Sequence, residues 1–257
     1  MKFTYIVAYR NSTDRINNLR KILKWVSKFD CEIIIVESDR ESYIKTQEFD
    51  TPFEHIFLPN EFPFNKAWCF NVAWKSAIND IIVFGDADLV MDSDSLLESI
   101  NKTSEYECVN PYSSVVDLTY DETFDYWSNG DMSRLISISR PGRGETDHQK
   151  VPFCGGIIIF RKESLEKVCG WNEDFWGWGA EDDFQSIKVK NYLSHLQVKD
   201  KCYHLWHIRG NINQELYYRN LHLYNQYLPL SKEQLYDITL KTKESIGHID
   251  KIEKLKS

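Results

Sequence analysis

The sequence predicts an α/β fold, a mixed sheet flanked by helices, and three observations support this expectation. Two apolar runs, Phe3–Tyr9 and Cys31–Val36, enclose the amphipathic segment Asn17–Phe29, whose apolar residues recur with helical spacing. This order is a βαβ unit, and its crossover implies parallel strands in a layered fold. Short apolar runs then alternate with helical segments along the chain. The 257 residues, 42% of them hydrophobic, suffice for a full core.

The remaining elements follow from the same patterns. Short apolar or extended runs predict strands at His55–Leu58, Ile81–Phe84, Cys108–Pro111, Val115–Leu118, Cys154–Phe160 and Leu196–His204. Helical spacing predicts helices at Asn65–Ile78, Ser93–Thr103, Lys162–Val168, Glu181–Leu193, Asn213–Tyr227 and, as a terminal helical segment, Ser231–Ser257. Ser93 or Asp94 is the expected N-cap of its helix.

The stretch Tyr120–Lys150 is the least regular part of the sequence. It contains Asn129-Gly130 and Pro141-Gly142, which are typical of turns. A loop of this length inside a compact domain is a lid, a binding loop or a disordered segment. Because no strong linker divides the chain, we expect one domain over residues 1–210. We expect a C-terminal helical extension, 211–257, packed on that domain or on a second copy of the chain.

Composition and charge exclude several classes of function. The net charge is −8 and no basic block precedes the last few residues, so nucleic acid is not an expected partner. The six cysteines are scattered without a CxxC pair, which argues against a zinc knuckle or a redox motif. The aromatic content of 14%, with eight tryptophans, suits a protein that stacks on rings, including sugars.

No targeting or membrane-spanning segment is evident in the sequence. The N-terminus enters a strand without a signal-peptide core, and no apolar run reaches the roughly 18 residues that span a bilayer. We therefore expect a cytoplasmic protein. Lysines along the terminal helix would allow at most peripheral docking on the inner face of a membrane.

Two carboxylates, Asp86 and Asp88, follow the apolar strand Ile81–Phe84. In an extended segment they point the same way, and two like charges side by side favour a cation or a donor between them. A strand-end turn with solvated acids is the alternative. Ligands of open α/β sheets bind beyond the carboxyl ends of strands, which favours a site here.

The pair His204 and His207 has the spacing HxxH after an extended run. Each histidine alone is more often a packed or surface residue than a ligand. Together with one or two aspartates they suit a divalent ion such as Mn²⁺, and zinc accepts the same ligands. An open octahedral site with room for phosphate oxygens fits the mixture of carboxylate and imidazole better than a zinc site does.

The segment Phe175–Ala180 alternates tryptophan with glycine and leads into Glu181, Asp182 and Asp183. Such a loop suits a wall against which a flat ligand lies. The three acids open a helix, whose N-terminus stabilises carboxylates in the charged form. A mere helix cap is the alternative, and three acids directly after this loop favour a site.

Two further positions suit a phosphate or a nucleotide base. Phe64-Asn65-Lys66 opens a helix whose positive end carries a lysine, and Arg10 follows the first strand. The alternative is an ordinary N-cap, Asn65, beside a surface Lys66.

At this point several motifs together resemble one enzyme family. IVAYRN, FNKAWCFNVAWKSA, VFGDADLV, FCGGIIIFRKESLEKVCGW and FWGWGAEDD occur in the order seen in metal-dependent inverting glycosyltransferases of the A-type, Rossmann-like fold. The sequence most resembles the catalytic domain of β-1,4-galactosyltransferases and related bacterial capsule and lipopolysaccharide transferases. The resemblance covers roughly residues 3 to 210, and the WGWGxEDD block is its most specific part.

The resemblance implies a role for each matching position. The uridine and diphosphate would be held by Arg10, Phe64 and Lys66. At the position of Lys66 the family usually has arginine. Asp86 would face the donor, and Gly156 and Trp178 would border the sugar and acceptor pocket. Glu181 and Asp182 would bind the acceptor, with Asp182 as catalytic base. The metal, Mn²⁺ or Mg²⁺, would be held by Asp88, His207 and His204.

The sequence departs from the family in two places. His204 stands where galactosyltransferases carry methionine, which puts the metal preference in doubt. Phe153 stands where the family often has tyrosine, which puts the donor sugar in doubt. The expected activity is transfer of a hexose or N-acetylhexosamine, galactose-type favoured, from a UDP-sugar to an oligosaccharide or lipid-linked glycan acceptor. The rivals are a metal-dependent phosphoesterase and a non-catalytic glycan-binding module.

Overall fold

The computed structural model describes residues 1–146, 149–208, 210 and 213–256. In this part of the chain the strands form one seven-stranded sheet, in the order β3-β2-β1-β4-β8-β6-β9, and one three-stranded sheet, β5-β10-β7. The strands are β1 (Thr4–Tyr9), β2 (Glu32–Asp39), β3 (Glu54–Pro59), β4 (Ile81–Asp86), β5 (Leu89–Met91), β6 (Cys108–Asn110), β7 (Ser114–Asp117), β8 (Ile158–Arg161), β9 (His195–Gln197) and β10 (Lys201–His204).

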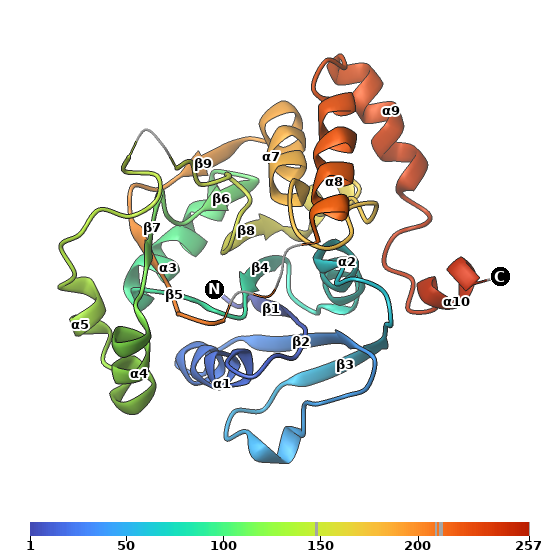
Figure 1. Ribbon diagram of the computed structural model, residues 1–257. Helices are drawn as coiled ribbons and strands as arrows, with labels where there is room; N and C mark the ends of the chain where they lie inside the picture. Colours follow the sequence, from blue (N-terminus) through green and yellow to red (C-terminus); the bar gives the residue numbers. More distant parts are fainter. Residues whose placement is uncertain (147–148, 209, 211–212, 257) are drawn as a thin grey trace.

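Helices cover the sheets on both sides (Figure 1). The α-helices are α1 (Arg15–Val26), α2 (Lys66–Ser76), α3 (Ser93–Asn101), α4 (Tyr120–Asn129), α5 (Met132–Ile136), α6 (Lys162–Lys167), α7 (Glu181–Tyr192), α8 (Gln214–Tyr227), α9 (Lys232–Thr242) and α10 (Lys251–Lys256). Two 3-10 turns, Thr46–Glu48 and Lys102–Ser104, lie between them. The α/β fold with a mixed sheet is therefore confirmed.

The parallel half of the large sheet is built around β1. Strands β2 and β4 pair with β1 in parallel, and β8 then runs antiparallel to β4. Every residue of β1 is buried, because one apolar core lies on each face of the sheet. Helix α1 packs Leu19, Ile22 and Leu23 into the first core, and α2 lies almost wholly within the second. This parallel arrangement brings the carboxyl ends of β1, β2 and β4 to one edge.

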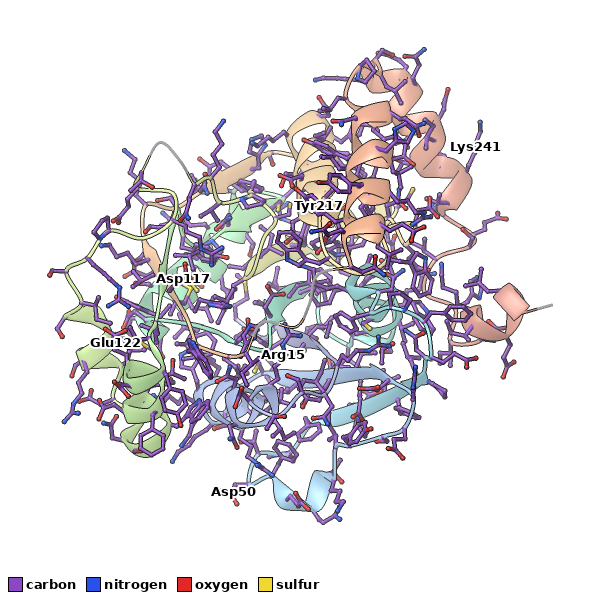
Figure 2. The ribbon with its side chains drawn as sticks, viewed as in Figure 1. Arg15, Asp50, Asp117, Glu122, Tyr217 and Lys241 are labelled. Atoms are coloured by element: carbon purple, nitrogen blue, oxygen red, sulfur yellow. The ribbon has the colours of Figure 1, made fainter. Side chains whose placement is uncertain are left out.

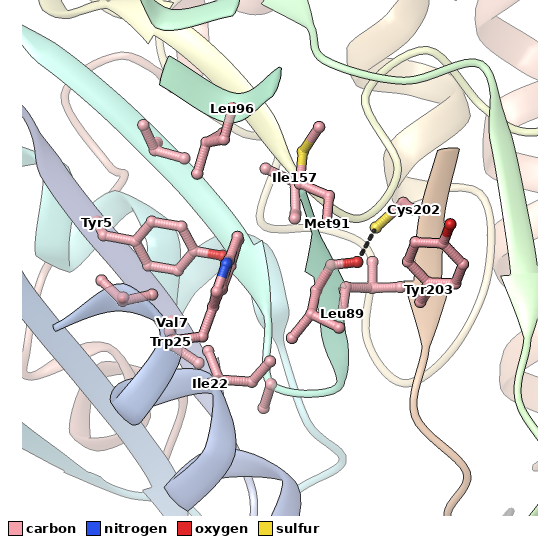
Figure 3. Packing of buried hydrophobic residues seen from close by; sticks show 14 of the residues in the cluster. Tyr5, Val7, Ile22, Trp25, Leu89, Met91, Leu96, Ile157, Cys202 and Tyr203 are labelled. Atoms are coloured by element: carbon pink, nitrogen blue, oxygen red, sulfur yellow. Dashed lines mark hydrogen bonds between the residues drawn. The ribbon is translucent and has the colours of Figure 1, made fainter. Parts of the chain in front are cut away.

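The three-stranded sheet is fixed to the same core. Leu89 and Met91 of β5 and Cys202 and Tyr203 of β10 belong to the cluster that includes α1 and one face of β1 (Figure 3). The thiol of Cys202 donates to the carbonyl of Val90 at 3.2 Å, across the antiparallel β5–β10 pair. This packing places β5, which directly follows Asp88, beside β10, which ends at His204.

Several element boundaries differ from the predictions. The stretch Tyr120–Lys150, predicted as irregular, begins with the two helices α4 and α5. A capping box starts α4, in which Thr119 and Glu122 each bond the other's backbone N–H, and Gly130 ends it in the left-handed region. Residues 147 and 148 of this stretch lie outside the described residues. The N-cap of α3 is Asp92, one residue before the predicted pair.

The apolar run Cys154–Phe160 is a strand only from Ile158 onward. Gly156 has a φ of +73°, and the hydroxyl of Tyr112 donates to the carbonyl of Gly155, so the chain turns before the strand begins. Apolar character alone does not separate such a buried turn from a buried strand. Strand β5 was not predicted, since it has only three residues.

The C-terminal segment forms helices that pack on the domain. Phe175 and Phe184 meet Tyr227 of α8 and Leu235 of α9 in a separate apolar cluster. The predicted single terminal helix, Ser231–Ser257, is instead α9 and α10 with Gly247 between them, and Ser257 lies outside the described residues. The domain boundary at residue 210 stays a prediction. Among the described helices, none has the length and apolar character that crossing a bilayer requires.

Candidate active site

Strand pairing in the small sheet brings the side chains of Asp88, His204 and Asp117 next to one another. In the antiparallel pair His204 lies opposite Leu89, the neighbour of Asp88, and in the parallel pair it lies opposite Asp117. Backbone hydrogen bonds extend both pairs, from Leu205 N–H to the Asp88 carbonyl and from Leu118 N–H to the His204 carbonyl. The sequence-distant carboxylates therefore flank the imidazole of His204.

Asp88, His204 and His207 form a cluster suited to a metal ion. Their ligand atoms all lie within 4.8 Å of one another. The Nε2 atom of His207 lies 3.2 Å from Asp88 Oδ2, and the Nε2 atom of His204 lies 3.8 Å from Asp88 Oδ1. One carboxylate and two imidazoles fit Mn²⁺ or Zn²⁺. The predicted metal ligands are thus brought together, and a cavity of about 410 Å³ opens beside both histidines.

The charges in this cluster are strongly coupled. Burial tends to raise the pKa of Asp88, but the hydrogen bond from His207 and the charge of His204 hold that pKa well below its ordinary value. The same hydrogen bond raises the pKa of His207. The carboxylate is therefore ionised and available to a cation throughout the physiological range.

A second cluster gathers three carboxylates around Lys66. Its Nζ lies 2.8 Å and 3.0 Å from the two carboxylate oxygens of Asp182, 3.4 Å from Glu181 and 3.8 Å from Asp86. Asn65 caps α2 by accepting from Trp68 N–H, which leaves Lys66 as the first residue of the helix. Asp86 ends β4 two residues before Asp88, so the two clusters are neighbours.

Two acids of the second cluster, Asp182 and Asp86, have raised pKa values. Desolvation raises the pKa of Asp182 to about 8, against the opposing charge of Lys66, and Glu181 and Asp86 add to the rise. Desolvation likewise raises the pKa of Asp86. Although burial opposes it, the three carboxylates hold the pKa of Lys66 well above its ordinary value. One ammonium group thus lies within 4 Å of three half-buried carboxylates, and the expectation that the helix N-terminus stabilises Asp182 in the charged form stays a prediction.

Two glycines border this cluster for different reasons. A Cβ on Gly156 would lie 2.1 Å from the hydroxyl of Tyr112, so close packing excludes a side chain. A Cβ on Gly155 would lie 3.5 Å from Asp182 Oδ2, so the absence of a side chain leaves space at that carboxylate. The structure therefore places Gly155 against the candidate base, and the expectation that Gly156 borders the sugar and acceptor pocket stays a prediction.

The tryptophan and glycine loop forms an exposed aromatic face. Trp178 is 61% exposed and stacks on Tyr217 of α8, with ring centroids 5.4 Å apart. A Cβ on Gly179 would lie 2.9 Å from the ring of Tyr217, so glycine permits this approach. The carbonyl of Phe64 accepts from Gly177 N–H at 2.7 Å, which fastens the loop beside the start of α2.

Arg10 and Phe64 lie together but apart from the acids that Lys66 binds. The guanidinium of Arg10 lies over the ring of Phe64, 5.6 Å from its centroid. It donates to the carbonyls of Ser38, Asn60 and Phe62. Arg10 therefore braces the loop between β3 and α2, and these backbone contacts occupy much of its donor capacity.

Sequence reasoning missed Asp117 and Tyr112. The carboxylate of Asp117 lies 3.2 Å from His204 Nδ1, and this contact lowers the pKa of Asp117. A carboxylate inside the predicted strand Val115–Leu118 was the signal that could have revealed it. Tyr112 showed no such signal, because its role depends on contacts with Gly155 and Ile157 distant in sequence.

Comparison with known proteins gives two family matches. The family described as glycosyl transferase family 2 matches residues 4–169, and the one described as the N-terminal domain of galactosyltransferase matches residues 147–207. Mouse beta-1,4-galactosyltransferase 4 is 24% identical over 152 residues, which is 58% of this chain and 36% of the mouse protein. Bovine beta-1,4-galactosyltransferase 1 is 22% identical over 81% of this chain and 49% of its own length. The chain thus spans half or less of these relatives.

Solved structures share the fold at low sequence identity. A Drosophila β1,4-galactosyltransferase 7 mutant, in complex with manganese, UDP-Gal and xylobiose, has a TM-score of 0.52 and 17% identity over 83% of this chain and 77% of its own. Residues 1–349 of S. aureus TarS have a TM-score of 0.59 and 16% identity, over 95% and 71%. Glucosyl-3-phosphoglycerate synthase from Mycobacterium tuberculosis, with Mn²⁺, UDP and phosphoglyceric acid, has a TM-score of 0.52 and 15% identity, over 95% and 79%.

Proposed function

Because this chain belongs to glycosyl transferase family 2 and has the glycosyltransferase A-type fold, we propose that it transfers a hexose or N-acetylhexosamine from a UDP-sugar to a glycan hydroxyl. We further propose a single displacement that inverts the anomeric carbon, with a galactose-type donor favoured. The observation that carries the proposal is the adjacency of the Asp88, His204 and His207 cluster to the acids around Lys66.

The first cluster would hold Mn²⁺ or Mg²⁺. Asp88 offers a carboxylate, and each imidazole offers Nε2 once its Nδ1 carries the proton. A bound cation supplies charge neutralisation at the departing diphosphate. Lys66, at the positive end of α2, can pair with a phosphate oxygen.

The second cluster would activate the acceptor. Asp182 takes the proton of the attacking hydroxyl as the new bond forms, and Glu181 orients that hydroxyl. The space beside Gly155 admits an acceptor to Asp182. Once ionised, a carboxyl whose pKa is raised to about 8 is a stronger base than an ordinary aspartate, so transfer should rise as the pH approaches that value.

The exposed Trp178 face would stack on a sugar ring of the acceptor. Its apolar surface excludes water from the reacting carbon, which limits hydrolysis of the donor. Aromatic faces suit the apolar face of a pyranose, whereas a phosphoesterase has no need of one. The same loop touches α8, so the C-terminal helices would help to shape the acceptor side.

An assay of sugar transfer from several UDP-sugars, with and without Mn²⁺, tests the proposal. We expect metal-dependent release of UDP that rises when a glycan acceptor is added, and a product of inverted anomeric configuration by NMR. Hydrolysis of simple phosphate esters without an acceptor would instead indicate the phosphoesterase. Glycan binding that is indifferent to UDP and metal would indicate a binding module.

A further inference from the structure

The side chain of Asp117 contacts Nδ1 of His204, whereas Asp88 lies near Nε2 of the same ring. Both residues end strands of the small sheet and are direct partners in the parallel β7–β10 register. Asp117 Oδ1 lies 3.2 Å from His204 Nδ1, while His204 Nε2 lies 3.8 Å from Asp88 Oδ1. A ring that donates from Nδ1 to Asp117 therefore keeps the lone pair of Nε2 directed into the Asp88 cluster.

His207 also directs its Nε2 toward Asp88, but its Nδ1 contacts a backbone carbonyl and not a carboxylate. Its Nδ1 lies 3.0 Å from the carbonyl oxygen of Ile208, and its Nε2 lies 3.2 Å from Asp88 Oδ2. The backbone thus orients one imidazole, and a side-chain carboxylate orients the other. A partner on the second ring nitrogen fixes both the tautomer and the ring angle of a ligating histidine.

The carboxylate of Asp117 is itself held by the segment that follows α5. Arg143 places Nε 2.9 Å from Asp117 Oδ2, and its Nη2 donates to Oδ1 at 3.2 Å. Backbone pairing with Val115 fixes Arg143 beside β7. Arg140 donates to the backbone carbonyl of Asp117 and pairs with both carboxylate oxygens of Glu122 on α4.

These contacts fix the segment that carries Arg140 and Arg143 beside the small sheet. Figure 2 shows Asp117 near the end of β7 and Glu122 on the helix that follows it. The orientation of Asp117 therefore depends on a strand register and on two arginines, rather than on its own rotamer alone.

We propose that Asp117 is a positioning residue, held by Arg143, that keeps His204 in the orientation and tautomer in which Nε2 binds a divalent cation. The inference rests on the metal site of the proposed function, and it adds a residue that acts through a ligand. Loss of such a partner lowers metal affinity by about 10- to 100-fold. Asp88, His204 and His207 remain the groups that meet the ion.

Binding of Mn²⁺ alone, without donor or acceptor, tests the proposal. Electron paramagnetic resonance of the free ion gives the Kd for the wild type, Asp117→Ala and Asp117→Asn. We expect Asp117→Ala to raise the Kd by about 10- to 100-fold, and Asp117→Asn, which keeps an acceptor oxygen, to raise it less. The matched control is Asp125→Ala on α4, whose carboxylate is exposed and pairs with Arg134, and its Kd should be unchanged. An unchanged Kd for Asp117→Ala overturns the proposal.

A double-mutant cycle separates positioning from direct ligation. In the His204→Ala background, substitution of Asp117 should cause no further loss of Mn²⁺ affinity, because the residue through which it acts is gone. A loss as large as in the wild type overturns the proposal, since Asp117 would then touch the ion itself. If Asp117→Ala does not fold by circular dichroism, Asp117→Asn completes the cycle. Wild-type protein that binds no Mn²⁺ overturns it as well, whereas sugar transfer is scored separately with UDP-sugars.

Discussion

At the scale of single residues, Lys66 faces more negative charge than one ammonium group can neutralise. Three carboxylates lie within 4 Å of its Nζ. Desolvation raises the pKa of Asp182 to about 8 and also raises that of Asp86, against the charge of Lys66. Because these two acids share one ammonium group, their titrations are coupled.

Asp182→Asn should remove transfer while the protein still binds UDP and metal. The amide keeps the shape of the side chain but cannot take a proton, so kcat should fall by about 10²- to 10⁴-fold. The matched control is Asp183→Asn, a half-buried acid at the next position of α7 that makes no contact with Lys66 in the described structure. Single-turnover kinetics and UDP titration measure both effects. Wild-type turnover by Asp182→Asn would show that another group is the base.

The stability of the protein should depend on pH through Asp182. Its carboxyl has an ordinary pKa of 3.8 when unfolded and about 8 when folded, so between these values the folded state binds more protons. Stability contributed by this group therefore decreases as the pH rises from about 4 to about 8. Urea unfolding of the metal-free protein should show a steeper loss with pH for the wild type than for Asp182→Asn. Equal slopes would contradict the raised pKa.

At the scale of elements, the turn before β8 decides how closely Tyr112 approaches the site. Gly156 adopts a φ of +73° and lies against the hydroxyl of Tyr112 and a methyl group of Leu89. The same hydroxyl donates to the carbonyl of Gly155 and accepts from Ile157 N–H. Tyr112 thus fixes the segment from Gly155 to Ile157, which lies beside Asp182.

Gly156→Ala should destabilise the protein more than Gly130→Ala does. Both positions have left-handed φ values, +73° and +67°, so both substitutions carry a backbone strain of about 1–2 kcal/mol. A Cβ at 130 meets nothing within 4 Å, whereas one at 156 meets two side chains closer than 2.5 Å. Calorimetry should show a lower Tm for Gly156→Ala. Equal Tm values would mean that Tyr112 and Leu89 move aside without cost.

The predicted elements agree best with the structure where the apolar pattern of the sequence is clear. Helix α1 follows from it because it buries one continuous face, whereas β1 and α2 are continuous apolar runs that are buried on all sides. Helices α4 and α5 could not be found in the same way, since α4 shows exposed Tyr120 and Phe124 and its start depends on a capping box. Short strands such as β5 exist only through their partners, which a local pattern does not contain.

At the scale of the whole molecule, the site lies where the two sheets meet. The large sheet supplies Asp86, and the small sheet supplies His204 and Asp117, while α2 and α7 bring Lys66 and Asp182. The side chains at strand and helix ends could be predicted from the sequence, because chain order fixes which ends share an edge. Their pairing could not, since the Asp117–His204 contact depends on a register between strands 84 residues or more apart.

The position of manganese in a crystal soaked with Mn²⁺ and UDP tests this account most directly. Anomalous scattering at the manganese edge locates the ion without reference to activity. We expect one peak between the carboxylate of Asp88 and the Nε2 atoms of His204 and His207, with the diphosphate next to it and Lys66 drawn from Asp182 to a phosphate oxygen. A peak away from Asp88, or a diphosphate bound far from Lys66 and Asp182, would contradict the account.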